Sequence, residues 1–313
     1  MTGPIPTPQS AAAVFEALTG LPAVRVNRFS TGAAHYVYEV WPADGQPVVV
    51  RMGRTGQREE LQRGLVLMQR LAGLGVPLPR IIASRFDGDF PAVVMARLPG
   101  TDLGQVMDGL TPAQLAGIAG AVAGAQFAAS RSGSAGRYGF AAAPEDAPHA
   151  QWSDVIAASL TRSRRRMESA GFFDMRTCER VATLIELHRA ALDAQPAVPF
   201  LHDTTVRNVI VGPDGRFSGI VDVDDLCFGD PRFAPALTLA VMEGYGGPVG
   251  YVGEWMRVAG LRDDVLFRLY VALFLLDLMS EHGLTFNGNE AVSTEPARKR
   301  LSEAFERVVD SVN

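Results

Sequence analysis

Apolar and polar residues alternate over short segments in the first hundred residues of the chain. Segments 23–29, 36–41 and 46–52 are rich in Val, Tyr, Phe and Trp, and the turn sequence PADG separates the last two. These patterns predict three consecutive β-strands. In residues 58–74 the apolar positions recur every three or four residues, which predicts a helix. Two more strands are predicted, one within GVPLPRIIA and one in residues 90–100, where a Pro-Gly pair ends the run.

Helical patterns dominate after residue 100. The sequence LTPAQLAGIAGAVAGAQFAAS begins with a Thr-Pro pair, which is typical of a helix N-terminus. Further helices are predicted at 152–170 and 175–192, and again from about residue 232 to the end. A chain with strands first and helices later is expected to be an α+β protein. The change of pattern predicts two lobes, residues 1–98 and 99–313.

Six aspartates and one asparagine surround two short apolar runs in residues 200–231, FLHDTTVRNVIVGPDGRFSGIVDVDDLCFGDP. The runs NVIV and FSGIVDV, joined by the turn sequence GPDG, predict a β-hairpin. This hairpin would bring Asn208, at the start of the first strand, close to Asp222, at the end of the second. An amide oxygen and a carboxylate there suit Mg²⁺, and Asp203 on the preceding loop could accept a proton from a substrate hydroxyl. An acidic surface hairpin without catalytic function is the alternative interpretation.

The spacing of these residues resembles the aminoglycoside phosphotransferase and choline kinase family, whose members are related to the protein kinases. Asp203 is followed by Asn208 after four residues, by Asp222 fourteen residues later, and then by Gly-Asp-Pro at Asp230. The resemblance covers roughly residues 25 to 245. It implies a protein-kinase-like fold in which a small β-rich nucleotide-binding lobe (1–98) meets a larger, mostly helical catalytic and substrate-binding lobe (99–313), with ATP in the cleft between them.

The resemblance also implies roles in the C-terminal lobe. Asp203 would be the catalytic base, or the carboxylate that orients the hydroxyl, and Asn208 and Asp222 would bind Mg²⁺. Asp230 would have a structural role. Because Asp230 precedes a proline, its sequence position independently predicts that it caps a helix that starts near Arg232.

In the N-terminal lobe, the resemblance implies nucleotide contacts. The family's nucleotide-covering loop would lie at FSTGAAH, with Ser30, Thr31 and Gly32 beside the phosphates. The strand VVVRM places Arg51 where kinases carry a phosphate-contacting lysine, and arginine can bind phosphate with two nitrogens. The strand VVMARL would be the hinge strand, whose backbone groups around Met95 and Arg97 would meet adenine.

Four departures from the family pattern affect these roles. The acid expected to pair with Arg51 would fall near Gly64; Glu60, with Glu59 beside it, lies one helical turn earlier and is the candidate. The histidine of the catalytic loop has moved to His202, where packing or catalysis are both possible roles. Arg207 would face either phosphate or solvent. The helix at 122–127 lacks a histidine that is common in the family.

Composition narrows the classes of protein that fit. The 313 residues are 47% hydrophobic and 20% charged, and the formal net charge of −5 argues against nucleic acid as the main partner. The most apolar stretch, 270–279, is too short for a membrane span and is interrupted by Asp277, so a buried helix is expected. With no signal-peptide pattern, a cytoplasmic enzyme is expected. Cys178 and Cys227 are expected to be buried free thiols.

Acidic residues beyond the catalytic motifs favour a cationic acceptor such as an aminosugar or choline. Asp224 and Asp225 follow closely on Asp222, and Asp277 interrupts an apolar helix, where it needs a partner, either a ligand amine or a nearby arginine. For most other acidic residues a solvated helix face is the simpler interpretation. Together these features predict an ATP- and Mg²⁺-dependent O-phosphotransferase that acts on a small-molecule hydroxyl. The alternative is a catalytically weak kinase-fold protein that binds nucleotide or a small molecule.

Overall fold

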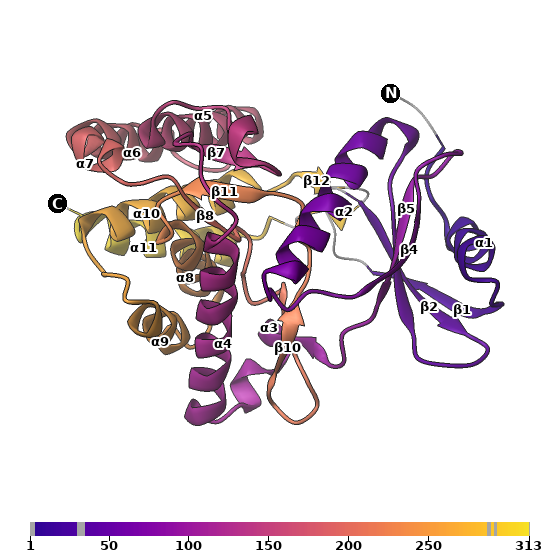
Figure 1. Ribbon diagram of the computed structural model, residues 1–313. Coiled ribbons are helices and arrows are strands. Elements are labelled where there is room, and N and C mark those ends of the chain that lie inside the picture. The colour runs from indigo at the N-terminus through magenta and orange to yellow at the C-terminus, as the bar shows by residue number, and fades with distance from the viewer. Residues whose placement is uncertain (1–3, 30–34, 287–288, 291–292, 313) are drawn as a thin grey trace.

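The chain folds into a β-rich N-terminal lobe and a larger, mostly helical C-terminal lobe (Figure 1). The computed structural model describes residues 4–29, 35–286, 289–290 and 293–312. The predicted α+β class is confirmed, with strands in the first part of the chain and helices in the second.

The N-terminal lobe is built on one antiparallel sheet with the strand order β1-β2-β3-β5-β4. All five strands were predicted from the residue pattern, with small differences at their ends. Their bounds are β1 Ala23–Arg28, β2 Tyr36–Pro42, β3 Val48–Met52, β4 Ile81–Arg85 and β5 Ala92–Ala96. The alternation in β2, where Tyr36, Tyr38 and Val40 are buried, matches the period of a strand with one covered face.

Two helices cover the two faces of this sheet (Figure 1). On one face, α1 (Pro8–Thr19) packs Val14 and Phe15 against the buried side chains of β2 and β3. On the other face, α2 (Arg58–Gly73), preceded by the short helix η1 (Thr55–Gln57), packs Leu61 and Met68 against β5. Figure 1 shows α2 on the side of the sheet that faces the C-terminal lobe. The helix α2 was predicted, and α1 was not.

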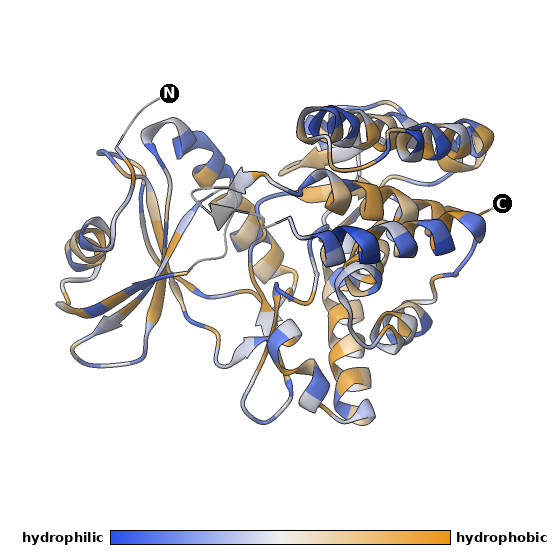
Figure 2. Cartoon of the chain, turned by 180° about the vertical axis from the view of Figure 1, so that it is seen from behind, coloured by the Kyte–Doolittle hydropathy of each residue, from blue (hydrophilic) through white to orange (hydrophobic). Residues whose placement is uncertain are grey.

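The C-terminal lobe is organised around α10 (Val265–Ser280), which packs against α5, α6, α8 and α11 and is buried over most of its length. The predicted buried helix at 270–279 is therefore confirmed. None of the helices in the described part of the chain is both long and apolar enough to cross a lipid bilayer. Figure 2 shows apolar residues along most of α4 (Pro112–Ser130), which packs against α9. The remaining helices are α3 Leu103–Val106, η2 Met107–Gly109, η3 Pro144–Asp146, α5 Trp152–Ala170, α6 Arg176–Leu187, α7 Arg189–Asp193, α8 Phe233–Tyr245, α9 Gly250–Ala259 and α11 Glu295–Asp310.

Short strands line the boundary between the lobes. The predicted hairpin forms from β9 (Val209–Val211) and β10 (Phe217–Ile220), and β6 (Thr101–Asp102) adds to it just after the chain leaves the N-terminal sheet. A second small sheet has the order β7-β11-β8, with β7 Gly139–Ala141, β8 Val198–Phe200 and β11 Leu226–Gly229. A third pairs β12 (Thr285–Phe286) with β13 (Asn289–Glu290). The hairpin strand β10 ends two residues before Asp222, earlier than predicted.

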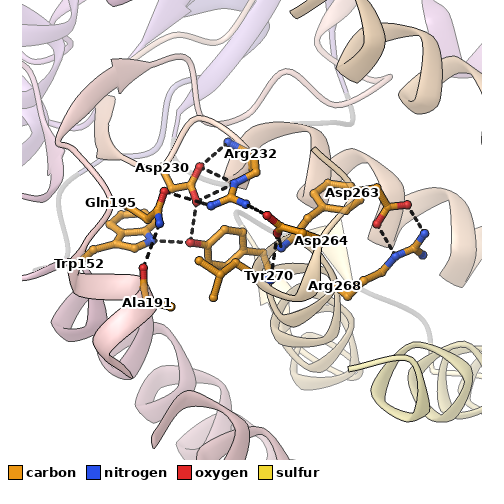
Figure 3. A network of polar contacts seen from close by, with 11 residues as sticks. Trp152, Ala191, Gln195, Asp230, Arg232, Asp263, Asp264, Arg268 and Tyr270 are labelled. Atoms are coloured by element: carbon orange, nitrogen blue, oxygen red, sulfur yellow. Dashed lines mark hydrogen bonds and ion pairs between the residues drawn. The ribbon is translucent and has the colours of Figure 1, made fainter. Parts of the chain in front are cut away.

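A buried polar network fixes the chain between β11 and α8 (Figure 3). Asp230 is 2% exposed, and it accepts hydrogen bonds from the backbone and the guanidinium of Arg232 at 2.6–3.0 Å and from the Tyr270 hydroxyl at 2.9 Å. Trp152 donates its indole N–H to the same hydroxyl at 2.9 Å. Arg232 also donates to Asp264 at 2.5 Å.

The predicted capping role of Asp230 needs correction. The helix α8 starts at Phe233, and Arg232 occupies the capping position, without a capping bond from its side chain. The Asp230 carboxylate instead accepts a hydrogen bond from the backbone N–H of Arg232 and forms a buried ion pair with its guanidinium. The pair is needed because an apolar interior tolerates a carboxylate only with a partner. Cys178 and Cys227 are buried and free, as predicted.

Candidate active site

The loop between β8 and β9 carries Asp203 and Asn208. Asp203 is exposed, and one of its carboxylate oxygens, Oδ1, accepts a hydrogen bond from the Thr205 hydroxyl at 2.9 Å. Asn208 donates its side-chain N–H to the backbone oxygen of Asp203 at 3.0 Å, which turns the amide nitrogen toward the loop. The short loop thus holds both side chains in one orientation and leaves Asp203 accessible.

A glutamine on α4 supports this loop from beneath. Gln126 donates to the backbone oxygen of Leu201 at 2.8 Å and to the Thr204 hydroxyl at 3.0 Å, and it accepts from the Leu201 N–H at 2.9 Å. Gln126 lies in the helix segment where the family histidine is missing. The absence of the histidine could be predicted from the sequence, whereas the bracing role of the glutamine could not, because it depends on a contact with a loop 75 residues away.

Asp222 lies just beyond the hairpin, next to Asn208. The Val221 N–H donates to the Asn208 backbone oxygen at 2.9 Å, so the two strand ends are adjacent, as the hairpin prediction required. Asp222 has a φ of 62°, and among the described residues it is the only non-glycine residue with positive φ. Such a conformation is unfavourable for a residue with a side chain and recurs at functional sites. Partial desolvation raises the pKa of Asp222, although 52% of its side chain is exposed, and the nearby Arg51 opposes that shift.

Arg51 of β3 connects the two lobes through side-chain contacts. Its Nη2 donates to Asp222 Oδ1 at 3.1 Å, to Asp224 Oδ2, and to the ring nitrogen Nδ1 of His35 at 2.7 Å. The Arg51 side chain is 9% exposed. Burial lowers the pKa of Arg51, but the carboxylates of Asp224 and Asp222 outweigh it, and the pKa is raised overall.

His35 completes this cluster on the N-terminal side. Burial, and then the charge of Arg51, lower the pKa of His35 to about 4. The ring is therefore neutral at pH 7, and Nδ1 can accept the hydrogen bond from Arg51. The other ring nitrogen, Nε2, lies 3.7 Å from Oε1 of Glu60 on α2. Sequence analysis did not identify His35, because histidine next to a glycine-containing loop carries no specific signal.

The predicted nucleotide contacts occupy different environments. Glu60 lies close enough to raise the pKa of Arg51, while burial raises the pKa of Glu60 itself; the carboxylates that bind Arg51 directly are those of Asp222 and Asp224. Met95 is buried against α2, and Arg97 contacts Glu39 at 2.6 Å. Ser30, Thr31 and Gly32 lie outside the described residues.

The three predicted acceptor residues are not brought into one cluster. Asp224 binds Arg51, and Asp225 is exposed beside it, with a pKa raised by burial and by the charge of Asp224. Asp277 accepts a hydrogen bond from Ser163 at 2.6 Å and forms an ion pair with Arg162 at 3.3 Å. Of the two partners considered for Asp277, the structure therefore shows arginine. Another acidic side chain nearby, Glu281, has a pKa raised by burial and by the charge of Asp277.

His202 is packed among aromatic rings rather than exposed to the cleft. Its ring lies 4.7 Å from Phe140, 5.6 Å from Phe233 and 5.8 Å from Phe274, measured between centroids. Burial lowers the pKa of His202, so the neutral ring is favoured. Of the two roles considered for His202, this environment supports packing.

The family model of the phosphotransferase enzyme family matches residues 25–255, which is most of the chain. The chain belongs to this family. No curated protein matches the chain.

Solved structures of other phosphotransferases share the fold. A candidate fructosamine-3-kinase from Thermobifida fusca is 19% identical, with 96% of this chain and 99% of that chain covered and a TM-score of 0.64. The aminoglycoside phosphotransferase APH(4)-Ia is 16% identical, with 93% and 95% covered and a TM-score of 0.67. A thermostable APH(4)-Ia mutant in complex with AMP-PNP and hygromycin B is 17% identical, with 96% and 98% covered and a TM-score of 0.66. The predicted family resemblance, the kinase-like fold and the enzyme class, a phosphotransferase with an alcohol group as acceptor, are confirmed.

The side chains of Asp222 and Asn208 suit a hard cation, such as Mg²⁺, that keeps part of its hydration shell when it binds. Within the described ranges, no group of three or more His, Cys, Asp or Glu side chains is arranged to hold a metal ion. Mg²⁺ in phosphotransferases is commonly held by one or two protein ligands, together with phosphate oxygens and water. The half-exposed carboxylate of Asp222 and the adjacent amide of Asn208 fit that pattern.

Proposed function

We propose that this phosphotransferase is an ATP- and Mg²⁺-dependent kinase of the aminoglycoside phosphotransferase type, which transfers the γ-phosphoryl group of ATP to the hydroxyl of a small molecule. The observation that carries the proposal is the meeting of Arg51 from the N-terminal sheet with Asp222 at the end of the hairpin, beside Asn208. A cationic group, an amide and a carboxylate thus converge between the lobes. The AMP-PNP bound in the APH(4)-Ia complex supports a nucleotide in this cleft.

Asp203 is the proposed catalytic residue. Thr205 occupies Oδ1 of its carboxylate, whereas Oδ2 has no hydrogen-bond partner among the residues that the structure describes. A substrate hydroxyl can donate to that oxygen, which orients the attacking oxygen toward the γ-phosphorus. A bond forms between the acceptor oxygen and phosphorus, the bond to the ADP oxygen breaks, and the proton of the hydroxyl passes to Asp203.

Asn208 and Asp222 are the residues that would hold Mg²⁺, which when bound neutralises charge on the phosphate oxygens. Arg51 would bind a phosphate group through its guanidinium. The negative charge of Glu60 would help to keep the guanidinium of Arg51 charged. Backbone groups around Met95 and Arg97 would meet the adenine.

The nucleotide-covering role of Ser30, Thr31 and Gly32 is part of the same proposal, as is the division into a nucleotide-binding lobe of residues 1–98 and a catalytic lobe of residues 99–313.

The proposed acceptor is a hydroxylated small molecule, and a cationic one is favoured by the local charge. Asp224 and Asp277 already bind arginines, so they offer less to a ligand than their sequence positions indicated. Asp225 and Glu281 have pKa values raised by burial and by a neighbouring carboxylate. A cationic ligand group near either side chain would relieve that repulsion.

The test measures ATP consumption with Mg²⁺ against aminoglycosides, macrolides, amino alcohols and sugars. Asp203→Ala should lower turnover by roughly 100- to 10,000-fold, the usual contribution of a general base, with nucleotide affinity by calorimetry unchanged. Asp214→Ala, which removes an exposed carboxylate at the turn of the same hairpin, is the matched control and should keep full turnover.

Equal turnover of Asp203→Ala and wild type would refute the assignment of Asp203. Tight nucleotide binding with no turnover on any acceptor would favour the alternative, a catalytically weak binding protein. Absence of nucleotide binding by the wild type would refute the proposed function.

A further inference from the structure

We propose that Asp224 is the positioning residue for Arg51, in place of an acid on α2, and that Gly64 leaves space for it. The inference rests on the proposed function, in which Arg51 binds a phosphate group of the nucleotide. It concerns how this chain holds that arginine before any ligand is bound.

The first observation is the set of partners around Arg51. Its Nη2 atom contacts Asp224 directly, in addition to Asp222 at 3.1 Å and His35 at 2.7 Å. Among carboxylates, Asp224 is also the leading cause that raises the pKa of Arg51. Glu60, the acid on α2, lies 3.7 Å from His35 instead. It raises the pKa of Arg51 less than Asp224 and Asp222 do.

The second observation concerns the surface of α2 that faces this pair. A Cβ atom added to Gly64 would lie 3.1 Å from Oδ1 of Asp224 and 3.8 Å from its Cα. Gly64 is buried in the middle of α2, where glycine costs about 1 kcal/mol relative to alanine. The absence of a side chain at Gly64 therefore lets Asp224 pack against the helix where a side chain from α2 would otherwise stand.

The third point concerns the carboxylates that would remain around Arg51 if Asp224 were absent. Asp222 would be the only carboxylate in direct contact with Arg51 among the described residues. Since Asp222 is also a proposed Mg²⁺ ligand, Arg51 would then pair only with a carboxylate that is required to bind the metal ion. Asp224 gives Arg51 a second anchor, so the guanidinium stays in the cleft without depending on Asp222.

The experiment measures binding of Mg²⁺-free ATP by calorimetry, because this removes any contribution from a metal site. Asp224→Asn should weaken binding at least fivefold, whereas Glu60→Gln should weaken it less. Asp44→Asn, an exposed acid in the turn between β2 and β3, should change affinity less than twofold. In an Arg51→Met background, Asp224→Asn should cause no further loss, because its effect passes through Arg51.

A relocated carboxylate provides a second test. In the variant Gly64→Glu combined with Asp224→Gly, the acid starts from a Cβ that lies 3.1 Å from the place of Asp224 Oδ1, and we expect it to recover most of the lost affinity. The proposal is overturned if Asp224→Asn binds ATP as well as or better than wild type, if its effect persists without Arg51, or if the relocated acid recovers nothing. Wild type that binds no nucleotide would refute the proposed function instead, so the two failures are distinguishable.

Discussion

Replacement of Asp230 by asparagine should destabilise the protein through loss of charge alone. The substitution keeps the shape of the side chain, but it leaves the guanidinium of Arg232, whose side chain is 10% exposed, without its buried counter-ion (Figure 3). Removal of one partner from a buried ion pair costs about 3–5 kcal/mol. Arg232 keeps its contacts with Asp264 and Gln195, so we expect the lower end, about 3 kcal/mol.

The size of the change in melting temperature follows from the size of the chain. The entropy of unfolding is roughly 2.1 cal/mol/K per residue, or about 0.7 kcal/mol/K for this chain, which has 313 residues. A loss of about 3 kcal/mol at the melting temperature therefore corresponds to a fall of about 4–5 °C. Calorimetry or circular dichroism on purified protein would measure it, with denaturant titration as a check.

The chain supplies a matched control within the same view (Figure 3). Asp263 also pairs with an arginine, Arg268, but its side chain is 47% exposed. Exposed ion pairs contribute about 0–1 kcal/mol, so Asp263→Asn should change the melting temperature by roughly 1 °C or less. If the two variants melted at the same temperature, burial would not be what makes the Asp230 pair important, and the argument would be refuted.

Three other variants test separate features of the structure. Burial and Arg51 lower the pKa of His35 to about 4. As the pH falls from about 6.5 to about 4, the unfolded chain takes up a proton at His35 before the folded chain does, so wild type should lose stability relative to His35→Gln. Parallel stability curves from denaturant titration across that range would contradict this. Gly229→Ala should destabilise the folded protein by about 1–3 kcal/mol or more, because the added Cβ would lie 2.2 Å from the Trp152 ring. Gly117→Ala should stabilise it, because Gly117 is exposed on α4 and an added Cβ would have nothing within 4 Å. Equal shifts of the two variants in thermal melts would refute the packing argument. Gln126→Leu should lower turnover more than nucleotide affinity, because Gln126 holds the loop that carries the proposed base, and equal losses in both would place its effect elsewhere.

Much of the fold could be predicted from the residue pattern, because its elements follow local rules. The five N-terminal strands, the hairpin of β9 and β10, and the helix α10 all follow hydrophobic periodicity and turn residues. The helix α1 was missed, although Thr7 and Pro8 provide the same Thr-Pro start that predicted α4.

The cluster around Arg51 could not be predicted in the same way. Arg51 and Asp224 are 173 residues apart, and their contact depends on how the two lobes pack together. Local pattern contains no such information. The sequence pointed to an acid on α2 because helix spacing is a local property, whereas the direct contact comes from a loop of the other lobe. Asp277 is similar, since its arginine partner lies on α5, 115 residues away.

The connection between the lobes is short and is held against the small sheet. Only residues 97–100 separate β5 from β6, and β6 is already paired with the hairpin strand β9. Arg97 donates to the backbone oxygens of Leu98 and Gly100, and a Cβ at Gly100, where φ is 107°, would lie 1.8 Å from the oxygen of Val211. The C-terminal end of this connection is thus fastened to the small sheet, against the strand that follows Asn208. Any rotation of one lobe about this connection would turn Arg51 relative to the hairpin, so mutations at residues 98–100, which are not among the proposed nucleotide contacts, should alter catalysis.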